Sequence, residues 1–346
     1  MAAIRASEPR PRPPIPDSPR TRRAPSVLDH PGPPSHSARL ACVVGTSYTG
    51  STLLALLVNA HPEVLSLGEL NGAMSRVLWP AYRCSCGAPL GDCDFWRRVS
   101  EAMHRRGFDF GARQWNTSFT LGTHALTRHI LVRSLGADSL DRARARLLAR
   151  SETSGGRLRE IGLRNAALVE SVTECAGKPI LVYTSKDPMR VRFLTGFSGL
   201  VPQVIHLVRH PLGFVSSDLR HSQATVDASV RGWVRRQRQV LRLRRAFPED
   251  RWLTVRYEDM CIRTEQEVAR MLDFLGATTP DAWIDALMGH EHHVLGNEMR
   301  MRWPAGVQMD LSWRTRLSGA DVRLVLARTE LLRRGFGYAD LDPLFQ

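Results

Sequence analysis

The chain lacks long hydrophobic runs, and this absence bears first on membrane insertion. Of its 346 residues, 43% are hydrophobic, enough for a full core, yet no run reaches the length of about 20 apolar residues that a membrane-spanning helix needs. Near the N-terminus, prolines and charges stand where a secretory signal would have its apolar stretch. We therefore expect a soluble protein without a transmembrane segment, located in the cytoplasm.

Recognised nucleic-acid-binding motifs are missing too, although the charge would suit them. The formal net charge is +14 and is carried mainly by arginine. Such a balance attracts anions of several kinds, among them nucleic acids, membrane surfaces, nucleotides and sulfated or phosphorylated substrates. There is no heptad repeat, no C2H2 zinc-finger spacing and no aromatic-rich RNA-binding signature. We therefore expect no nucleic-acid partner, and the sequence leaves the oligomeric state open.

Cysteine is scarce, and half of the six cysteines form one cluster. Cys84-Ser85-Cys86-Gly87 with Cys93 resembles a zinc knuckle with one ligand missing, because a closed tetrahedral site needs four. A fourth ligand could come from elsewhere in the chain, such as a histidine. A disulfide is a second alternative, and free structural thiols are favoured over both, so we expect no metal. The other three are interpreted as plain buried residues: Cys42, Cys175 and Cys261.

Three histidines precede a glycine near the C-terminus. His290, His292 and His293 stand just before Gly296, and such a group could suggest a metal site. Their place before a loop favours loop histidines or neighbours of a bound nucleotide instead.

Residues 1–38 are rich in proline and arginine and predict a disordered tail, because such a segment cannot bury apolar surface or hold a helix. A single domain is expected over 39–346. Short apolar runs in it predict strands at Leu40–Val44, Glu63–Leu67, Ile180–Tyr183, Val204–Val208 and Leu253–Tyr257. Helical patterns between them predict an α/β fold of three layers, α/β/α, around a mostly parallel sheet.

Several local signals refine this prediction. The leucines of Ser51–Ala60 make one apolar stripe of a helix, and Gly68-Glu69-Leu70 is expected to open another. Gly155-Gly156 predicts a flexible break. Thr264–Glu267 matches a capping box, and Gly276 a helix end.

Ligands of such folds bind beyond the carboxyl ends of the strands. The polar segments that follow the predicted strands are therefore expected to face one crevice: Thr46–Thr52, Gly68–Glu69, Thr184–Asp187, Arg209–Ser217 and Tyr257–Asp259.

The loop Gly45–Thr52 has the form G-x-x-x-x-G-S-T between a predicted strand and a predicted helix. This is the Walker A pattern with Ser51 in place of the lysine. Its backbone N–H groups and the helix start can hold an anion. A loop without the lysine suits a less charged anion than a triphosphate, such as a 5′-phosphosulfate. The alternative is an ordinary glycine turn between a strand and a helix.

A second anion site is predicted after the strand Val204–Val208. Arg209 stands at the strand end and Ser217 lies eight residues on, so both can converge on one phosphate, which the arginine fork matches. The alternative is a structural salt bridge of Arg209 and an incidental helical Ser217. Two phosphate sites together describe a 3′,5′-bisphosphorylated nucleoside.

From about Leu40 onward the chain resembles the sulfotransferases that use 3′-phosphoadenosine 5′-phosphosulfate, and bacterial members akin to the protein-tyrosine and carbohydrate branch in particular. The segments that carry the resemblance keep the family's order: Tyr48–Leu54 with His61–Val64, Gly68–Leu70, Ser185–Pro188, Arg209 with Ser217, Tyr257–Asp259 with Phe274–Gly276, and Gly296–Arg300 with Asp310–Trp313. The resemblance implies a fold like that of P-loop nucleoside triphosphate hydrolases.

The resemblance also implies roles for single residues. Glu69 would be the general base, and Lys186 would neutralise the bridging oxygen of the leaving group. The donor would be held by Tyr48, Thr49, Gly50, Ser51, Thr52, Arg209, Ser217 and Arg300. For Glu69 the alternative is a carboxylate that merely favours a helix N-terminus, and for Lys186 an exposed loop lysine. No metal would be needed.

Tyr48 departs from many members of that family, which carry lysine or arginine there. Charge stabilisation would then depend more on Lys186 and on backbone amides. The acceptor would be a hydroxyl or an amine on a small molecule, glycan or lipid, and residues 84–160 are predicted to form its pocket as an insertion.

Two rival functions remain at this point. A nucleotide-dependent kinase of the P-loop class would need the missing loop lysine. A non-catalytic nucleotide-binding module would keep its function without Glu69 or Lys186.

Overall fold

The computed structural model describes residues 38–70, 82–111, 115–121, 131–278, 292–301 and 306–338. The predicted tail therefore lies outside the described residues except for Ala38, which is buried. His290 also lies outside the described residues. Among the helices in these ranges, none is long and apolar enough to cross a membrane.

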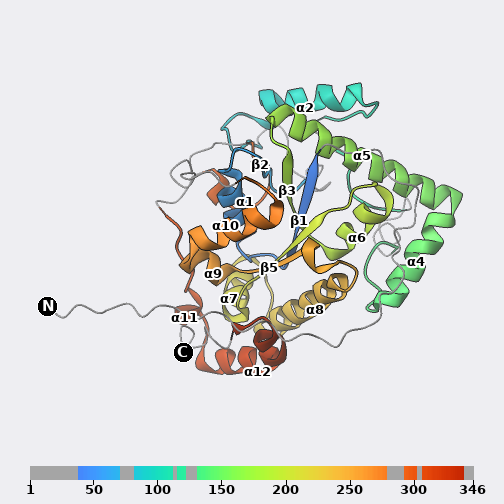
Figure 1. The fold of residues 1–346 in the computed structure, drawn as a ribbon. Coiled ribbons are helices and arrows are strands. Elements are labelled where there is room, and N and C mark those ends of the chain that lie inside the picture. The colour runs from blue at the N-terminus through green and yellow to red at the C-terminus, as the bar shows by residue number, and fades with distance from the viewer. Residues whose placement is uncertain are drawn as a thin grey trace.

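A parallel sheet of five strands forms the centre of the fold (Figure 1). Its strands are β1 (Arg39–Gly45), β2 (Val64–Leu65), β3 (Ile180–Lys186), β4 (Gln203–Val208) and β5 (Trp252–Arg256), in the spatial order β2-β3-β1-β4-β5. All four pairings are parallel. Each strand coincides with a predicted one, although β2 is shorter and β3 longer than its apolar run.

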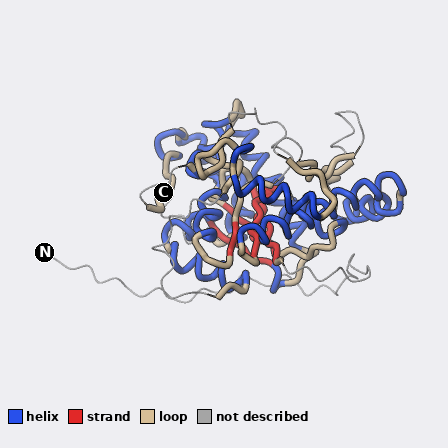
Figure 2. The backbone as a smooth tube through the Cα atoms, turned by 90° about the horizontal axis from the view of Figure 1, so that it is seen from above, coloured by secondary structure: helices blue, strands red, loops and turns tan. Residues whose placement is uncertain are grey.

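Eleven α-helices are assigned in the described part of the chain: α1 (Ser51–Asn59), α2 (Asp94–Arg105), α4 (Asp138–Arg150), α5 (Glu152–Ala176), α6 (Pro188–Phe197), α7 (Pro211–His221), α8 (Val226–Arg244), α9 (Tyr257–Ile262), α10 (Thr264–Leu275), α11 (Trp313–Arg316) and α12 (Gly319–Gly335). The view from above shows helices on both sides of the strands (Figure 2). The predicted three-layer α/β/α fold is confirmed.

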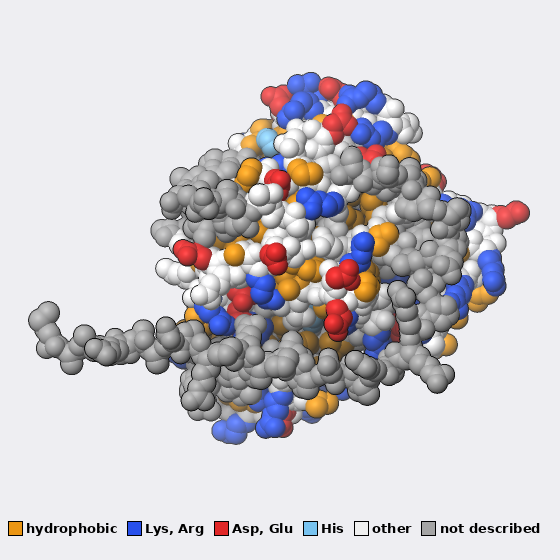
Figure 3. Space-filling model, viewed as in Figure 1, with side chains coloured by type: hydrophobic (Ala, Val, Ile, Leu, Met, Phe, Trp, Pro, Cys, Tyr) orange, Lys and Arg blue, Asp and Glu red, His pale blue; other side chains and the backbone are white. Residues whose placement is uncertain are grey.

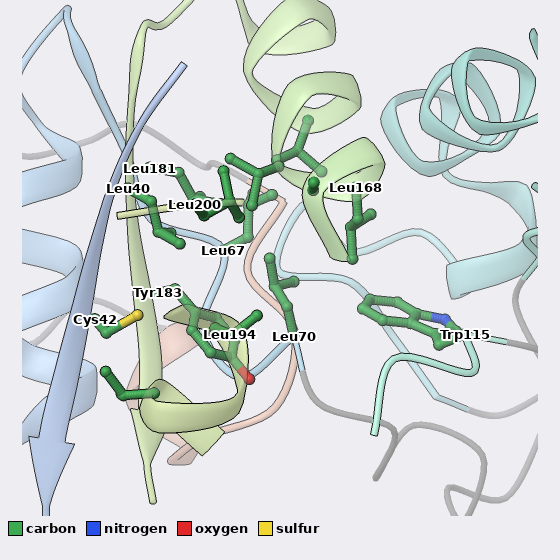
Figure 4. Packing of buried hydrophobic residues seen from close by; sticks show 14 of the residues in the cluster. Leu40, Cys42, Leu67, Leu70, Trp115, Leu168, Leu181, Tyr183, Leu194 and Leu200 are labelled. Atoms are coloured by element: carbon green, nitrogen blue, oxygen red, sulfur yellow. The ribbon is translucent and has the colours of Figure 1, made fainter. Parts of the chain in front are cut away.

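Side-chain alternation along the sheet builds two separate cores. In β1, Ala41 and Val43 join the cluster formed with α1, α9 and α10, whereas Leu40 and Cys42 face the opposite side with α5 and α6. Figure 4 shows that second side, where Leu40 and Cys42 lie beside residues of β3 and α6. Because successive residues of a strand point to opposite faces, a strand buried on both faces reads as a continuous apolar run.

A third cluster extends the domain at its C-terminal end. Residues of α7 and α8 pack there against α11 and α12, with Trp233 and Tyr338 fully buried. At the opposite end, basic and acidic side chains mix over α2 (Figure 3), and Arg97 there pairs with Asp94 and Glu101.

Gly155 and Gly156 do not form the predicted flexible break, because both lie inside α5. A Cβ on Gly155 would come within 2.7 Å of the Ala149 carbonyl oxygen and 2.8 Å of the Leu148 one. The glycine is therefore used for the close approach of α4 and α5, which meet at Ser151, the N-cap of α5.

One further local prediction is wrong, and another is not met within the described residues. The Thr264–Glu267 capping box is absent, since Arg263 is the N-cap of α10 and makes no side-chain cap hydrogen bond. Thr264 instead donates to the carbonyl of Met260 in the preceding helix α9, at 2.8 Å. Gly68–Leu70, which was expected to open a helix, is not itself helical, because Gly68 pairs with Val294 and has a φ of +83°. Residues 71–81, where such a helix would continue, lie outside the described residues. The helix end at Gly276 is confirmed by its left-handed conformation.

Candidate active site

The fold brings the predicted anion-binding loop, Lys186 and Arg209 to one edge of the sheet. β1 lies between β3 and β4, and its C-terminal residues pair with the ends of both neighbours, Val44 with Lys186 and Gly45 with Leu207. Glu69 reaches the same edge because the preceding residue, Gly68, accepts a hydrogen bond from Thr184 N at 3.2 Å. Four of the five polar segments predicted to share a crevice thus meet here.

The loop after β1 is compact and largely buried. Thr46, Thr49 and Ser51 are each at most 7% exposed, and Thr49 Oγ1 donates to the Thr46 carbonyl at 3.0 Å. The hydroxyl of Thr46 is buried without a hydrogen-bond partner among the described residues. Helix α1 begins at Ser51 with no side-chain cap, so its first N–H groups remain available to an anion.

Glycine is required at Gly50 for two reasons. Its φ of +85° lies in the left-handed region, and a Cβ there would lie 2.4 Å from the ring of Tyr257 at the start of α9. The fifth polar segment, Tyr257–Asp259, therefore adjoins the loop through the ring of Tyr257, which packs against Gly50. Tyr257 also accepts a hydrogen bond from Asp310 N at 3.1 Å.

Tyr48 contributes its backbone to the site. It has a φ of +59°, and its carbonyl accepts a hydrogen bond from Arg209 Nη1 at 2.9 Å. Its ring stacks on His221 of α7 at 5.1 Å between ring centroids. Burial, followed by the charge of Asp218, raises the pKa of its phenol, so Tyr48 is neutral at physiological pH and cannot replace a basic side chain.

Arg209 and Ser217 converge as predicted. The guanidinium of Arg209 donates to Ser217 Oγ at 3.1 Å, across two turns of α7, and lies 4.6 Å above the Tyr257 ring. Arg209 is only 5% exposed, and its Nε has no hydrogen-bond partner among the described residues. The alternative of a structural salt bridge also holds in part, because Arg209 Nη2 pairs with Asp310 Oδ2 at 3.0 Å.

Asp310 was not singled out from the sequence, although its segment Asp310–Trp313 was. Burial alone would raise the pKa of its carboxyl, but hydrogen bonds from Ser312 and from Arg209 lower it to about 2. Asp310 is therefore ionised throughout the physiological range and neutralises the arginine. Through the ion pair of Asp310 with Arg209, the loop after residue 306 contacts the predicted anion site after β4.

Glu69 and Lys186 form an ion pair between Oε1 and Nζ. The Glu69 side chain is 18% exposed and that of Lys186 27%, so both can be reached from solvent. Lys186 ends β3 at a register shift opposite Val43 and Val44 and has a φ of +55°. Asp187 then caps α6 through Met189 N at 3.0 Å, and this turn directs the chain away from the sheet directly after Lys186.

Arg300 does not join Arg209 and Ser217, contrary to the grouping expected from sequence. Its guanidinium donates to the carbonyl of Arg83 at 2.9 Å and lies 4.9 Å over the Tyr82 ring. The segment that carries it packs beside Glu69, since Val294 accepts from Glu69 N at 3.3 Å. It also adjoins the loop after β1, because Asn297 N donates to Thr52 Oγ1 at 3.2 Å. Its place as a donor-binding residue stays a prediction.

His293 lies on the same side and was interpreted only as a loop histidine or a nucleotide neighbour. Burial, and then the charges of Arg300 and Lys186, lower its pKa to about 4. A Cβ on Gly68 would lie 2.4 Å from its Nε2, which explains why glycine precedes Glu69.

The cysteine cluster does gain a histidine. The ligand atoms of Cys84, Cys86, Cys93 and His292 all lie within 4.8 Å of one another, and all six cysteines of the chain are free thiols. Free thiols were the favoured alternative, but the histidine was not assigned to them, because 199 residues separate it from Cys93.

Comparisons with known proteins identify the family of the chain. The model of the sulfotransferase family matches residues 41–281. Similar solved structures include the sulfotransferase domain of the Synechococcus PCC 7002 olefin synthase, at 18% identity over 88% of this chain and 96% of that one, with a TM-score of 0.45. The sulfotransferase domain of the curacin biosynthetic pathway is similar at 14% identity over 85% and 98%, with a TM-score of 0.47.

Sulfotransferase STF1 of Mycobacterium tuberculosis is similar at 16% identity over 84% of this chain and 76% of that one, with a TM-score of 0.42. No curated protein matches the chain. The family model, which covers the loop after β1 through α10, therefore carries the assignment.

Proposed function

Since the chain belongs to the sulfotransferase family, we propose that its sulfuryl donor is 3′-phosphoadenosine 5′-phosphosulfate and that its acceptor is a hydroxyl or an amine. The 5′-phosphosulfate binds the loop Gly45–Thr52, and the 3′-phosphate binds Arg209 and Ser217. The rest of the mechanism follows from the ion pair of Glu69 and Lys186. This pair lies after β2 and β3, on the side of β1 opposite to β4 and Arg209.

The observation that carries the donor proposal is the hydrogen bonding of Arg209. One guanidinium nitrogen bonds both to the backbone of the first anion site, at Tyr48, and to Ser217 of the second. Two anion sites that share one arginine are adjacent, as the two phosphate ends of one nucleoside require. Serine at the Walker A lysine position disfavours a triphosphate as the ligand.

In the proposed reaction the acceptor oxygen attacks the sulfur in line with the bridging oxygen. A bond forms between the acceptor oxygen and sulfur while the bond from sulfur to the bridging oxygen breaks, and that oxygen keeps the electron pair. Glu69 takes the acceptor proton, and Lys186 stabilises the charge that develops on the leaving bisphosphate. The two side chains are already in contact, so acceptor and donor would bind on either side of one pair.

The acceptor is proposed to enter from the side of residues 84–160. The described part of that segment approaches Glu69 through Ser85, whose Oγ accepts from His293 N. The next residue, Val294, accepts from Glu69 N. We propose a small-molecule, glycan or lipid acceptor and a cytoplasmic location.

A thermal-shift experiment with the full-length protein tests the donor. The phosphosulfate donor and the desulfated 3′,5′-bisphosphate should each raise Tm, by an amount that grows with the logarithm of the ligand concentration above Kd, whereas ATP at the same concentration should leave Tm nearly unchanged. A larger shift with ATP and magnesium would favour the kinase alternative. Transfer of radiolabelled sulfate to members of an acceptor panel then identifies the acceptor class.

A further inference from the structure

A second polar cluster, apart from the proposed active site, joins two segments that are distant in sequence. Cys84 and Cys86 lie in a tight turn in which Gly87 N donates to the Cys84 carbonyl at 2.9 Å. Cys93 is the N-cap of α2. The fourth member, His292, comes from the C-terminal part of the chain and stacks on Phe95 with ring centroids 4.6 Å apart and planes 1° apart.

Of three distances between ligand atoms in this cluster, two match the corners of a tetrahedron around one ion, and the third is about 0.4 Å shorter. Cys86 Sγ lies 3.7 Å from Cys93 Sγ, and His292 Nδ1 lies 3.7 Å from Cys84 Sγ and 3.1 Å from Cys93 Sγ. Zinc bonds of about 2.3 Å to sulfur and about 2.0 Å to nitrogen place the ligand atoms of a tetrahedral site roughly 3.5–3.8 Å apart. No pair is at the bonding distance of a disulfide, which is about 2.05 Å.

We propose that Cys84, Cys86, Cys93 and His292 bind one structural zinc ion. Three thiolates and one imidazole are a ligand set that zinc uses in closed sites, where no position stays open for water or substrate. Cys84 and Cys93 are buried and Cys86 is exposed, so the ion would enter from the Cys86 side. The N-terminus of α2 adds a positive dipole end beside Cys93.

The ion would hold the segment after His292, which adjoins Glu69, against the cysteine-bearing turn. Directly after His292, the backbone of His293 exchanges hydrogen bonds with Ser85, its N–H donating to Ser85 Oγ at 2.8 Å and its carbonyl accepting from Ser85 N at 3.3 Å. Val294 N then donates to the Leu67 carbonyl at 2.9 Å. The zinc site is thus two residues from the strand-like pairing that holds Gly68 and Glu69.

Metal analysis of the purified full-length protein tests this proposal. The protein should be prepared under reducing conditions without chelators, and any histidine tag should be removed before measurement. We expect about one equivalent of zinc per chain. Cobalt(II) added to protein stripped of metal should give the intense visible bands of a tetrahedral site and the near-ultraviolet charge-transfer bands of thiolate ligands.

The variant Cys86→Ser should lose at least nine-tenths of the zinc, and its exposed position makes misfolding from the substitution itself unimportant. Cys175→Ser, which changes a free thiol outside the cluster, should retain the zinc. A chelator should lower Tm of the wild type and of Cys175→Ser but leave Tm of Cys86→Ser unchanged.

Absence of zinc from the wild type together with no thiolate bands on adding cobalt would overturn the proposal. Equal zinc loss in Cys175→Ser and Cys86→Ser would overturn it as well. Neither result would affect the proposed donor, because the thermal shift with the bisphosphate is measured independently.

Discussion

The carboxylate of Glu69 contacts the ammonium of Lys186, although 117 residues separate them in sequence. The contact exists because β2 and β3 are neighbouring parallel strands whose carboxyl ends meet at one edge. It places the proposed base beside the proposed electrostatic catalyst. Substitutions in this pair can therefore be compared with substitutions at Arg209, in the proposed 3′-phosphate site.

Replacement of Glu69 by glutamine should separate chemistry from binding. Glu69→Gln keeps the size of the side chain but removes the proton acceptor, so turnover should fall by about a hundredfold. Affinity for the 3′,5′-bisphosphate should stay within about twofold, since the donor phosphates bind elsewhere. Steady-state kinetics and calorimetry measure the two effects. The exposed Glu101→Gln in α2 is the control, and near wild-type turnover of Glu69→Gln would exclude Glu69 as the base.

Loss of the Arg209 guanidinium should weaken donor binding, which the Glu69→Gln substitution should leave intact. Arg209→Ala removes hydrogen bonds to a charged phosphate, each contributing about 1.5–3 kcal/mol, so bisphosphate affinity should fall about tenfold to a hundredfold. Calorimetry measures the affinity. Because Arg209 is buried, thermal melting followed by circular dichroism should show that the Arg209→Ala variant is folded at the temperature of the binding experiment. Arg97→Ala, an exposed arginine on α2, should bind normally. Unchanged affinity in Arg209→Ala would remove Arg209 from the donor site.

Asp310 should weaken donor binding in the wild type, because its carboxylate occupies one edge of Arg209 at 3.0 Å. Asp310→Asn leaves an oxygen that can accept from Ser312 N but removes the competing charge. We expect bisphosphate affinity to rise several-fold, with a steeper dependence on salt. Weaker binding in Asp310→Asn would show instead that Asp310 positions the arginine.

Alanine substitutions at two glycines with the same backbone conformation can distinguish the cost of left-handed strain from the cost of a steric clash. Gly50 has a φ of +85° and Gly107 a φ of +81°, but only at Gly50 would a Cβ meet another group, the Tyr257 ring at 2.4 Å. Gly107→Ala should therefore cost only the left-handed strain of about 1 kcal/mol. Gly50→Ala should lower stability further and should abolish donor binding, as measured by urea unfolding and calorimetry. Equal effects of the two substitutions would contradict this assignment.

Buried histidines should make the fold sensitive to mild acid. Burial lowers the pKa of His206 from 6.5 to about 4 and that of His210 to about 3, the latter with help from Arg333 and Arg209. Below pH 6.5 the unfolded chain binds protons that the folded chain does not, so the free energy of unfolding should fall as pH drops from about 6.5 to about 4.

The slope should approach about 1.4 kcal/mol per pH unit for each such histidine. Urea unfolding at several pH values measures it, and His206→Asn should have a shallower slope than the wild type. The same slope in both proteins would mean that His206 is not the source.

Much of the molecule was determined by the sequence alone. The buried strands read as apolar runs because both faces of the sheet are covered. The glycine pattern of Gly45–Thr52 predicted the position of a tight turn after β1, because Gly50 adopts a left-handed conformation beside the Tyr257 ring. The predicted convergence of Arg209 and Ser217 agrees with the hydrogen bond between them, because Arg209 stands just before α7 and Ser217 lies two turns along it, where helical spacing brings the two together.

Only the tertiary structure decided which distant segments meet. Three contacts depend on where the described residues 292–301 and 306–338 lie in the fold: the pairing of Asp310 with Arg209, the approach of His292 to the three cysteines and the position of Arg300 beside Tyr82. No periodicity records such a path, because contacts between loops are set by the packing of whole elements rather than by the pattern within one of them.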